Sequence, residues 1–202
     1  MPTPAQVRGG LAGVDFVDVS GEWACVPVLT AVSEAVGRPI TIDTDMDILL
    51  DLARTHHIPV RDAMGPGALI EELYAELVEP HTTTPTFYLD FPQETSPLTR
   101  PHRTSPGLVE RWDLVIAGME VATAYTELTD PVDQRQRLTE QSFNGAGGDV
   151  EAMEVDEDFL VAMESGMPPT GGMGMGIDRL VMLLTNTSIR GVLSFPFVRP
   201  RV

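Results

Sequence analysis

Apolar residues at helical spacing mark three segments in the first part of the chain. The spacing predicts helices over residues 28–36, from Thr44 to just before Pro59, and over residues 66–77. Gly37 directly follows the first of these segments, where a residue in the left-handed conformation commonly ends a helix. The first part of the chain is therefore predicted to be helical, after a loose N-terminal arm.

The middle of the chain changes to the alternation of β-strands. Residues 86–91 alternate between apolar and more polar side chains, which predicts a strand. The side chains expected on its apolar face are Phe87, Leu89 and Phe91. Two further β-like runs, over residues 111–116 and 119–128, are joined by Ala117-Gly118. This arrangement predicts an antiparallel hairpin.

Polar helices and glycine-rich breaks fill the last part of the chain. The pattern predicts helices over residues 130–141, 150–164 and 177–185, a breaker-dense loop over residues 168–176, and a strand-like tail over residues 192–198. A flexible break is expected over Gly145–Gly148. The helix residues expected to face inward are Met153, Phe159, Leu160, Met163, Ile177, Leu180, Val181 and Leu184. Helices, then antiparallel strands, then helices indicate an α+β fold.

Composition narrows the function classes. The chain has 202 residues, of which 30 are acidic and 13 basic, giving a net charge of -17. All the basic residues are arginine, so lysine-based P-loop or Schiff-base chemistry is excluded, and nucleic-acid binding by this chain alone is not expected. One cysteine excludes an internal disulfide framework and favours the cytoplasm. No apolar run is long enough to cross a membrane.

Two carboxylates are expected on one face of the hairpin. If Ala117-Gly118 is a two-residue turn, Val115 pairs with Glu120 and Asp113 pairs with Ala122. Asp113 and Glu120 then share a face and repel each other unless a cation lies between them. The pattern indicates either a site for Mg²⁺ or Ca²⁺ or two carboxylates solvated on an exposed surface.

Glu127 raises a question of strand parity. It lies seven residues after Glu120, so on a regular strand the two side chains face opposite ways. If both serve one pocket, a β-bulge must lie between them, and we expect it near Thr123–Ala124. An unbroken ladder between Glu120 and Glu127 would contradict a shared pocket.

The glycine-rich stretch before residue 177 is a second candidate site. The run Gly172–Gly176 lacks the spacing of a dinucleotide-binding loop, but its glycines would let the backbone approach a flat ligand. Arg179 lies in the first turn of the helix that follows, where a cation needs an anionic partner. That partner is either Asp178 or a nucleotide phosphate.

Three segments together resemble a known family. They are Phe91-Pro92-x-Glu94-x-Ser96-Pro97-Leu98, then Met119–Leu128 with Asp130-Pro131, then Gly174–Leu180. In this order, over residues 15–200, they are similar to the C-terminal half of the catalytic domain of class II lysyl-tRNA synthetases, with Gly-Ile-Asp-Arg-Leu as motif 3. Residues 1–14, which are rich in Gly, Pro and Ala and show little periodicity, are expected to form a loose arm. The resemblance implies a truncated class II catalytic domain over residues 15–202, an antiparallel sheet flanked by helices.

The resemblance implies binding of ATP, Mg²⁺ and lysine for adenylate chemistry. Glu120 and Asp113 would hold the Mg²⁺ between the phosphates, although the family usually has Glu in place of Asp113. The implied lysine-binding residues are Thr123, where many members have Asn, Tyr125, and Glu127, whose carboxylate would pair with the ε-ammonium. The implied ATP-binding residues are Gly174 and Gly176, which leave room for adenine, and Arg179, which stacks on adenine, contacts the γ-phosphate and is the implied catalytic residue.

Departures from the family keep the function open. The anticodon-binding domain, motif 1 and motif 2 do not occur in this sequence, and one preorganised contact of the motif 2 kind is worth roughly 3–4 kcal/mol in the transition state. The chain is therefore either a lysine-tRNA ligase-like enzyme, a catalytically incomplete paralogue that binds a ligand or partner, or an activating subunit for a non-tRNA acceptor. A homodimer, or a second chain that supplies motifs 1 and 2, is the implied assembly. Val14–Val19 or a partner would have to fill the open sheet edge.

Overall fold

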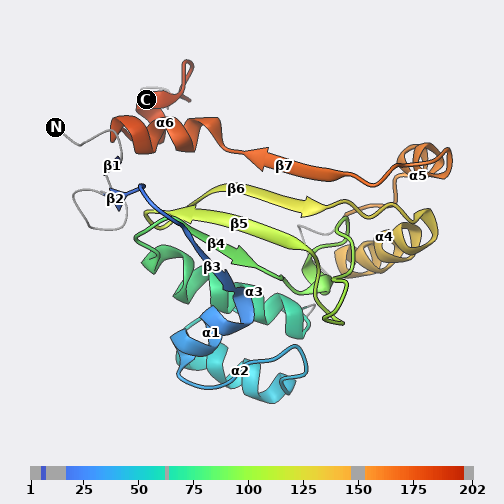
Figure 1. The fold of residues 1–202 in the computed structure, drawn as a ribbon. Coiled ribbons are helices and arrows are strands. Elements are labelled where there is room, and N and C mark those ends of the chain that lie inside the picture. Colours follow the sequence, from blue (N-terminus) through green and yellow to red (C-terminus); the bar gives the residue numbers. More distant parts are fainter. Residues whose placement is uncertain (1–5, 8–16, 62–63, 147–152, 198–202) are drawn as a thin grey trace, which may run out of the picture.

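A five-stranded sheet forms the centre of the protein (Figure 1). The computed structural model describes residues 6–7, 17–61, 64–146 and 153–197. The strands, in sheet order, are β3 (Ala24–Pro27), β4 (Thr86–Leu89), β5 (Arg111–Ile116), β6 (Met119–Thr126) and β7 (Gly171–Met175). Strands β4 to β7 pair antiparallel, as predicted for the β5–β6 hairpin, but β3 runs parallel to β4. The fold is thus α+β with a mixed sheet, because the unpredicted strand β3 joins it in parallel.

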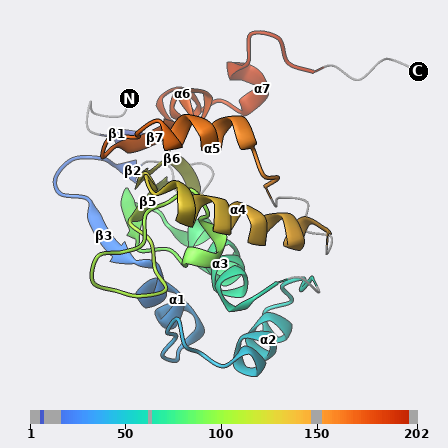
Figure 2. The same cartoon turned by 90° about the vertical axis from the view of Figure 1, so that its right-hand side faces the viewer.

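The helices surround the sheet in three groups (Figures 1 and 2). They are α1 (Val28–Val36), α2 (Met46–Thr55), α3 (Pro66–Leu77), α4 (Pro131–Ala146), α5 (Glu157–Glu164), α6 (Ile177–Thr185) and α7 (Ile189–Val192), with short 3-10 segments η2 (Glu79–His81) and η3 (Gln93–Thr95). Helices α1 to α3 lie together beside β3 and β4, α4 and α5 lie at one end of the sheet, and α6 follows β7. Among the helices of the described ranges, none is both long and apolar enough to cross a membrane.

The ends of the first helices follow from local chemistry. Gly37 ends α1 with φ 70° in the left-handed conformation, as predicted. The second helix begins later than expected, because Asp45 and not Thr44 caps it, accepting a hydrogen bond from Asp47 N at 2.8 Å. The Thr44 hydroxyl instead accepts from Thr41 N in the preceding turn.

A short ladder lies near the N-terminus. Strand β1 (Gln6–Val7) pairs antiparallel with β2 (Val17–Asp18). The rest of the predicted arm, apart from Gln6 and Val7, lies outside the described residues. The described part of Val14–Val19 pairs with β1 and does not extend the five-stranded sheet, whose described edges are β3 and β7.

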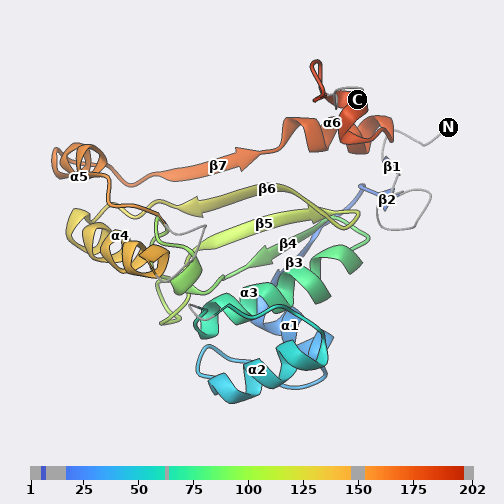
Figure 3. The same cartoon turned by 180° about the vertical axis from the view of Figure 1, so that it is seen from behind.

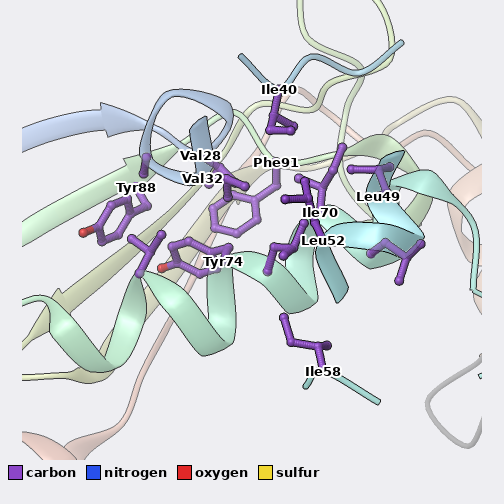
Figure 4. Packing of buried hydrophobic residues seen from close by; sticks show 14 of the residues in the cluster. Val28, Val32, Ile40, Leu49, Leu52, Ile58, Ile70, Tyr74, Tyr88 and Phe91 are labelled. Carbon is purple, nitrogen blue, oxygen red and sulfur yellow. The ribbon is translucent and has the colours of Figure 1, made fainter. Parts of the chain in front are cut away.

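The larger apolar cluster joins α1, α2 and α3 to one face of the sheet (Figure 4). Tyr74 on α3 packs against Tyr88 and Phe91, with ring centroids 5.1 and 5.4 Å away. Phe91 does not share a face with Phe87, contrary to the prediction. Asp90 has φ 62°, which breaks the strand, so Phe91 turns to the side of Tyr88 while Phe87 packs in the second cluster.

The second cluster lies on the other face of the sheet, under α6. Its buried residues are Val17, Leu114, Ile116, Ala117, Val121, Ala122 and Leu183. The predicted apolar face of α6 is wrong, because Leu183 is 3% exposed whereas Ile177 and Leu184 are 61% and 64% exposed. Leu180 packs against the cluster, as predicted. Helix α6 therefore packs on the sheet through Leu180 and Leu183, which lie three residues apart on one face of the helix.

The last third departs most from the predicted elements (Figure 3). Residues 171–175 form strand β7 on the edge of the sheet, not a loop, and the tail forms the short helix α7 with no strand over residues 193–197. Helix α4 continues to Ala146, past Gln141 and into the expected break at Gly145–Gly148, whose end lies outside the described residues. In and before α5, Leu160 and Met163 are buried as predicted, but Met153 and Phe159 are exposed.

Candidate functional site

A bulge in β6 decides which side chains share a face. Ile116 pairs with Met119 and Val115 with Glu120, as predicted, but the register then shifts, so that Leu114 pairs with Ala122 and Asp113 with Thr123. The predicted pair of Asp113 with Ala122 is therefore wrong. Val121 is the extra residue, so the predicted bulge between Glu120 and Glu127 is present, two residues before Thr123.

The bulge places Glu120 and Glu127 on the same face. Val115 pairs with Glu120 and Asp113 pairs with Thr123, and paired residues point to the same face of the sheet. Every second residue after Thr123, and so Tyr125 and Glu127, points to that face as well. A Cβ built on Gly172, which pairs with Tyr125, would overlap the Glu127 carboxylate. The ladder between Glu120 and Glu127 is broken, as a shared pocket requires.

Two rows of residues cross this face of the sheet. One row joins Asp113 on β5, Thr123 on β6 and Gly174 on β7, and the neighbouring row joins Arg111, Tyr125 and Gly172. Residues from three strands, distant in the sequence, therefore meet side by side. Except for Gly176 and Arg179, which follow β7, the predicted site residues all lie on this face.

Asp113 is held by a buried ion pair. Its side chain is 3% exposed, and Arg111 donates from Nε to Oδ1 at 3.1 Å and from Nη2 to Oδ2 at 2.7 Å. The Thr123 hydroxyl also donates to Oδ1, at 2.5 Å. Arg111 Nη1 bonds Glu71 on α3 at 3.1 Å, and burial raises the pKa of Glu71 although Arg111 opposes the rise. Arg111 and Glu71 were not predicted; the signal in the sequence is the spacing of Arg111 and Asp113, which puts both on one strand face.

The carboxylates fit a phosphate-bound Mg²⁺ unequally. Mg²⁺ held between substrate phosphates needs one or two protein carboxylates. Glu120 has a side chain that is 36% exposed and can approach a ligand. The charge of Asp113 is already balanced by Arg111. In the described parts of the chain, no group of three or more His, Cys, Asp or Glu side chains is placed to hold a metal ion. Glu120 is thus the main candidate, with Asp113 as a weaker second ligand.

Glu127 and Tyr125 form a separate acidic and aromatic corner. Glu127 is half-buried, burial raises its pKa, and it has no ion-pair partner among the described residues. Burial also raises the pKa of Tyr125, and the nearby Glu127 adds to the rise. Gly172, which was not predicted as a site residue, makes room for the Glu127 side chain. A partly buried carboxylate with no ion-pair partner in the described part of the chain is suited to bind a cation.

The Arg179 side chain contacts Glu120, and no ion pair or hydrogen bond joins it to Asp178. Its Nη1 donates to Glu120 O at 2.8 Å and lies 4.0 Å from Glu120 Oε1. Half of the Arg179 side chain is exposed, at 49%. A Cβ on Gly176 would lie 3.2 Å from Arg179 Cδ, whereas a Cβ on Gly174 would meet Thr123 Cγ2 at an ordinary 3.9 Å. The absence of a side chain at Gly176 therefore leaves room for the Arg179 side chain, and the space beside Gly174 is open.

An open cavity of about 600 Å³ adjoins the end of the sheet. Its lining includes Leu89, Trp112, Ala124 and Met173, and part of the loop that carries His102. These four strand residues pair across the sheet and point to the face opposite Thr123. Among the predicted site residues, Tyr125 alone lines it. Arg111, Tyr125 and Gly172 also line the cavity, so it adjoins the carboxylate face along this row of residues.

Comparison with known proteins gives one family and a set of similar proteins. The family model described as tRNA synthetases class II (D, K and N) matches residues 15–199. The chain is 60% identical over 199 residues to the lysylphosphatidylglycerol biosynthesis bifunctional protein LysX of Mycobacterium marinum, covering 98% of this chain and 18% of that protein. It is 56% identical over 184 residues to the protein of that name from Mycobacterium leprae, covering 91% of this chain and 16% of that protein.

The matches to these relatives cover nearly all of this chain, 98% and 91%. The chain spans less than a fifth of the length of these relatives, 18% and 16%. The family match covers the β5–β6 hairpin, β7 and α6, and thus every predicted site residue. The chain belongs to the class II tRNA synthetase family of the D, K and N type.

Proposed function

We propose that this chain carries the lysine- and ATP-binding face of a lysine-activating site. In the reaction, a lysine carboxylate oxygen attacks the α-phosphorus of ATP, the bond to the bridging oxygen breaks, and pyrophosphate leaves. The product is lysyl-adenylate. Glu120, with Asp113, would hold Mg²⁺ on the phosphates, and Arg179 would contact them from α6. The adenine would lie over Gly174. Such a reaction belongs in the cytoplasm, where ATP and free lysine are available.

The state of Glu127 is the observation that carries this proposal. A half-buried carboxylate with a raised pKa and no cation beside it among the described residues is unfavourable unless a ligand supplies the opposite charge. Tyr125 lies next to it and offers an aromatic wall to an alkyl chain. An alkyl chain ending in an ammonium group has both features that this corner would recognise.

The acceptor of the lysyl group is a further part of the proposal. The similar proteins are named for lysylphosphatidylglycerol biosynthesis. We propose that the activated lysine made with this chain is destined for phosphatidylglycerol, with the transfer carried out by other parts of a longer protein or by a partner. Delivery to tRNA alone is the competing outcome.

The test is lysine binding and lysine-dependent ATP–pyrophosphate exchange in the parent protein and in Glu127→Gln. An ion pair of this kind contributes about 1.5–3 kcal/mol, so Glu127→Gln should weaken lysine roughly 10- to 150-fold. Norleucine, which lacks the ε-ammonium, should bind the parent and the variant equally. The matched control is Glu76→Gln, an exposed glutamate on α3, which should leave both measurements unchanged.

The outcomes separate the alternatives. Exchange that depends on lysine and is lost in Glu127→Gln supports activation. Lysine binding without exchange would make the chain a ligand-binding paralogue, and equal binding of lysine and norleucine would overturn the assignment of Glu127.

A further inference from the structure

The turn of the β5–β6 hairpin packs against η2. Ala117 and Gly118 have φ of 54° and 73°, the positive values of a type I′ turn. Gly118 N donates to Thr82 O at 2.7 Å, and a Cβ on Gly118 would lie 2.9 Å from Pro80 O. The segment that follows α3 therefore fixes the position of the turn.

The β6 bulge starts just beyond this turn and is held by three hydrogen bonds. A bulge removes regular ladder partners from the backbone groups around it. Here Glu120 N donates to Glu79 Oε1 at 3.2 Å, Arg179 Nη1 donates to Glu120 O at 2.8 Å, and Gly176 N donates to Val121 O at 2.8 Å. Side chains and backbone from η2 and α6 thus replace the ladder at the bulge.

Glu79 is in an unfavourable place for a carboxylate. Burial raises its pKa, the hydrogen bond from Glu120 N opposes the rise, and the charges of Glu120 and Asp113 add to it. An apolar side chain at this position would avoid that desolvation and repulsion. The Glu120 N–H is the specific contact that a glutamate supplies here and an apolar residue cannot.

Loss of that contact would separate Glu120 from the other residues of the carboxylate face. Without the bulge, β6 would pair regularly, and a shift of one residue moves each side chain to the opposite face of the sheet. Glu120 would then lie on the opposite face of the sheet from Thr123, Tyr125 and Glu127. We propose that Glu79 is a positioning residue: by accepting the Glu120 N–H it holds the β6 bulge and keeps the Glu120 carboxylate on the face of the ATP site. This inference rests on the proposed function for the role of Glu120, but the geometry can be tested separately.

Hydrogen exchange of the Glu120 amide tests the geometry without substrates. Glu79→Gln keeps an oxygen acceptor of the same reach, and Glu79→Ala removes it. We expect slow exchange in the parent, in Glu79→Gln and in the control Glu76→Ala, and exchange at least roughly tenfold faster in Glu79→Ala. If Glu79→Ala does not fold, Glu79→Asp, which is one methylene shorter, replaces it with the same expectation. Unchanged protection in these variants would overturn the inference.

Steady-state kinetics then test the consequence. Removal of a residue that orients a metal ligand costs about 10- to 100-fold in metal affinity or activity. Glu79→Ala should therefore raise the KM for Mg²⁺·ATP by that factor, with the KM for lysine unchanged, and Glu79→Gln should restore the parent value. If Glu79→Gln fails as badly as Glu79→Ala, the charge and not the hydrogen bond matters, and the inference is wrong. A parent protein without exchange activity would defeat the proposed function, while the amide measurement would still decide the role of Glu79.

Discussion

Single residues on the carboxylate face have roles that their neighbours determine. Asp113 and Glu127 are both acidic and lie on the same face, but Arg111 balances one, and no described ion pair involves the other. A carboxylate is therefore part of a buried ion pair in one row and has no ion-pair partner among the described residues in the next. Neither difference can be read from the spacing of the two residues along the chain.

Lysine binding should depend on pH through Glu127. Burial raises the pKa of this carboxyl, so in the free protein it takes up a proton at a higher pH than an ordinary glutamate. Only the ionised form pairs with the ammonium group, so affinity should be full above the raised pKa and fall as the pH drops through it. Titration calorimetry across this range should show the fall in the parent and none in Glu127→Gln. A parallel fall in both would contradict the assignment.

Gly172 and Gly174 offer a matched pair of substitutions. A Cβ at position 172 would overlap the Glu127 carboxylate, whereas a Cβ at position 174 meets Thr123 at an ordinary distance of 3.9 Å. Gly172→Ala should therefore displace Glu127 and weaken lysine by a factor like that of Glu127→Gln, roughly tenfold or more. Gly174→Ala should leave lysine binding within about twofold, a change of roughly 0.4 kcal/mol. Equal effects of the two alanines on the Kd for lysine would show that Gly172 has no special role.

At the scale of elements, local patterns predicted some segments well and others poorly. Helix α1, its glycine cap and the hairpin turn follow from short-range rules, and all three were predicted. Strands β3 and β7 were missed. Ala24–Pro27 is too short to show alternation, and Gly171–Met175 has the composition of a loop. Both become strands because their backbones pair with β4 and β6, which are distant from them in the sequence.

Helix α6 shows how packing selects one of two apolar faces. Leu183 packs against β5 and β6, while Leu184, the next residue, is 64% exposed. Leu183→Ala should lower the free energy of unfolding by about 2–5 kcal/mol. Leu184→Ala should change it by no more than about 0.5 kcal/mol. Urea unfolding monitored by circular dichroism measures both, and a larger loss in Leu184→Ala would reverse the assigned orientation of the helix.

At the scale of the whole molecule, the net charge of -17 acts on every element. Self-repulsion of a highly charged chain destabilises its compact state. Raising NaCl from about 0.01 to 1 M shortens the Debye length from roughly 30 to 3 Å and should raise Tm by several degrees. Sucrose, which strengthens burial without screening charge, serves as the comparison. A Tm that stays constant or falls with salt would show that local ion pairs, such as Arg111 with Asp113, outweigh the repulsion.

The sequence by itself determined the α+β class, the helices before β4, the hairpin, and the candidate residues that the family match covers. These depend on periodicity, turn chemistry and motifs, which act over a few residues. The tertiary structure alone decided the position of the bulge, the pairing of Arg111 with Asp113, the contact of Glu79 with the Glu120 N–H, and the room that Gly172 leaves for Glu127. Each joins residues from different elements, and the burial and strand register that set it exist only once the sheet has formed.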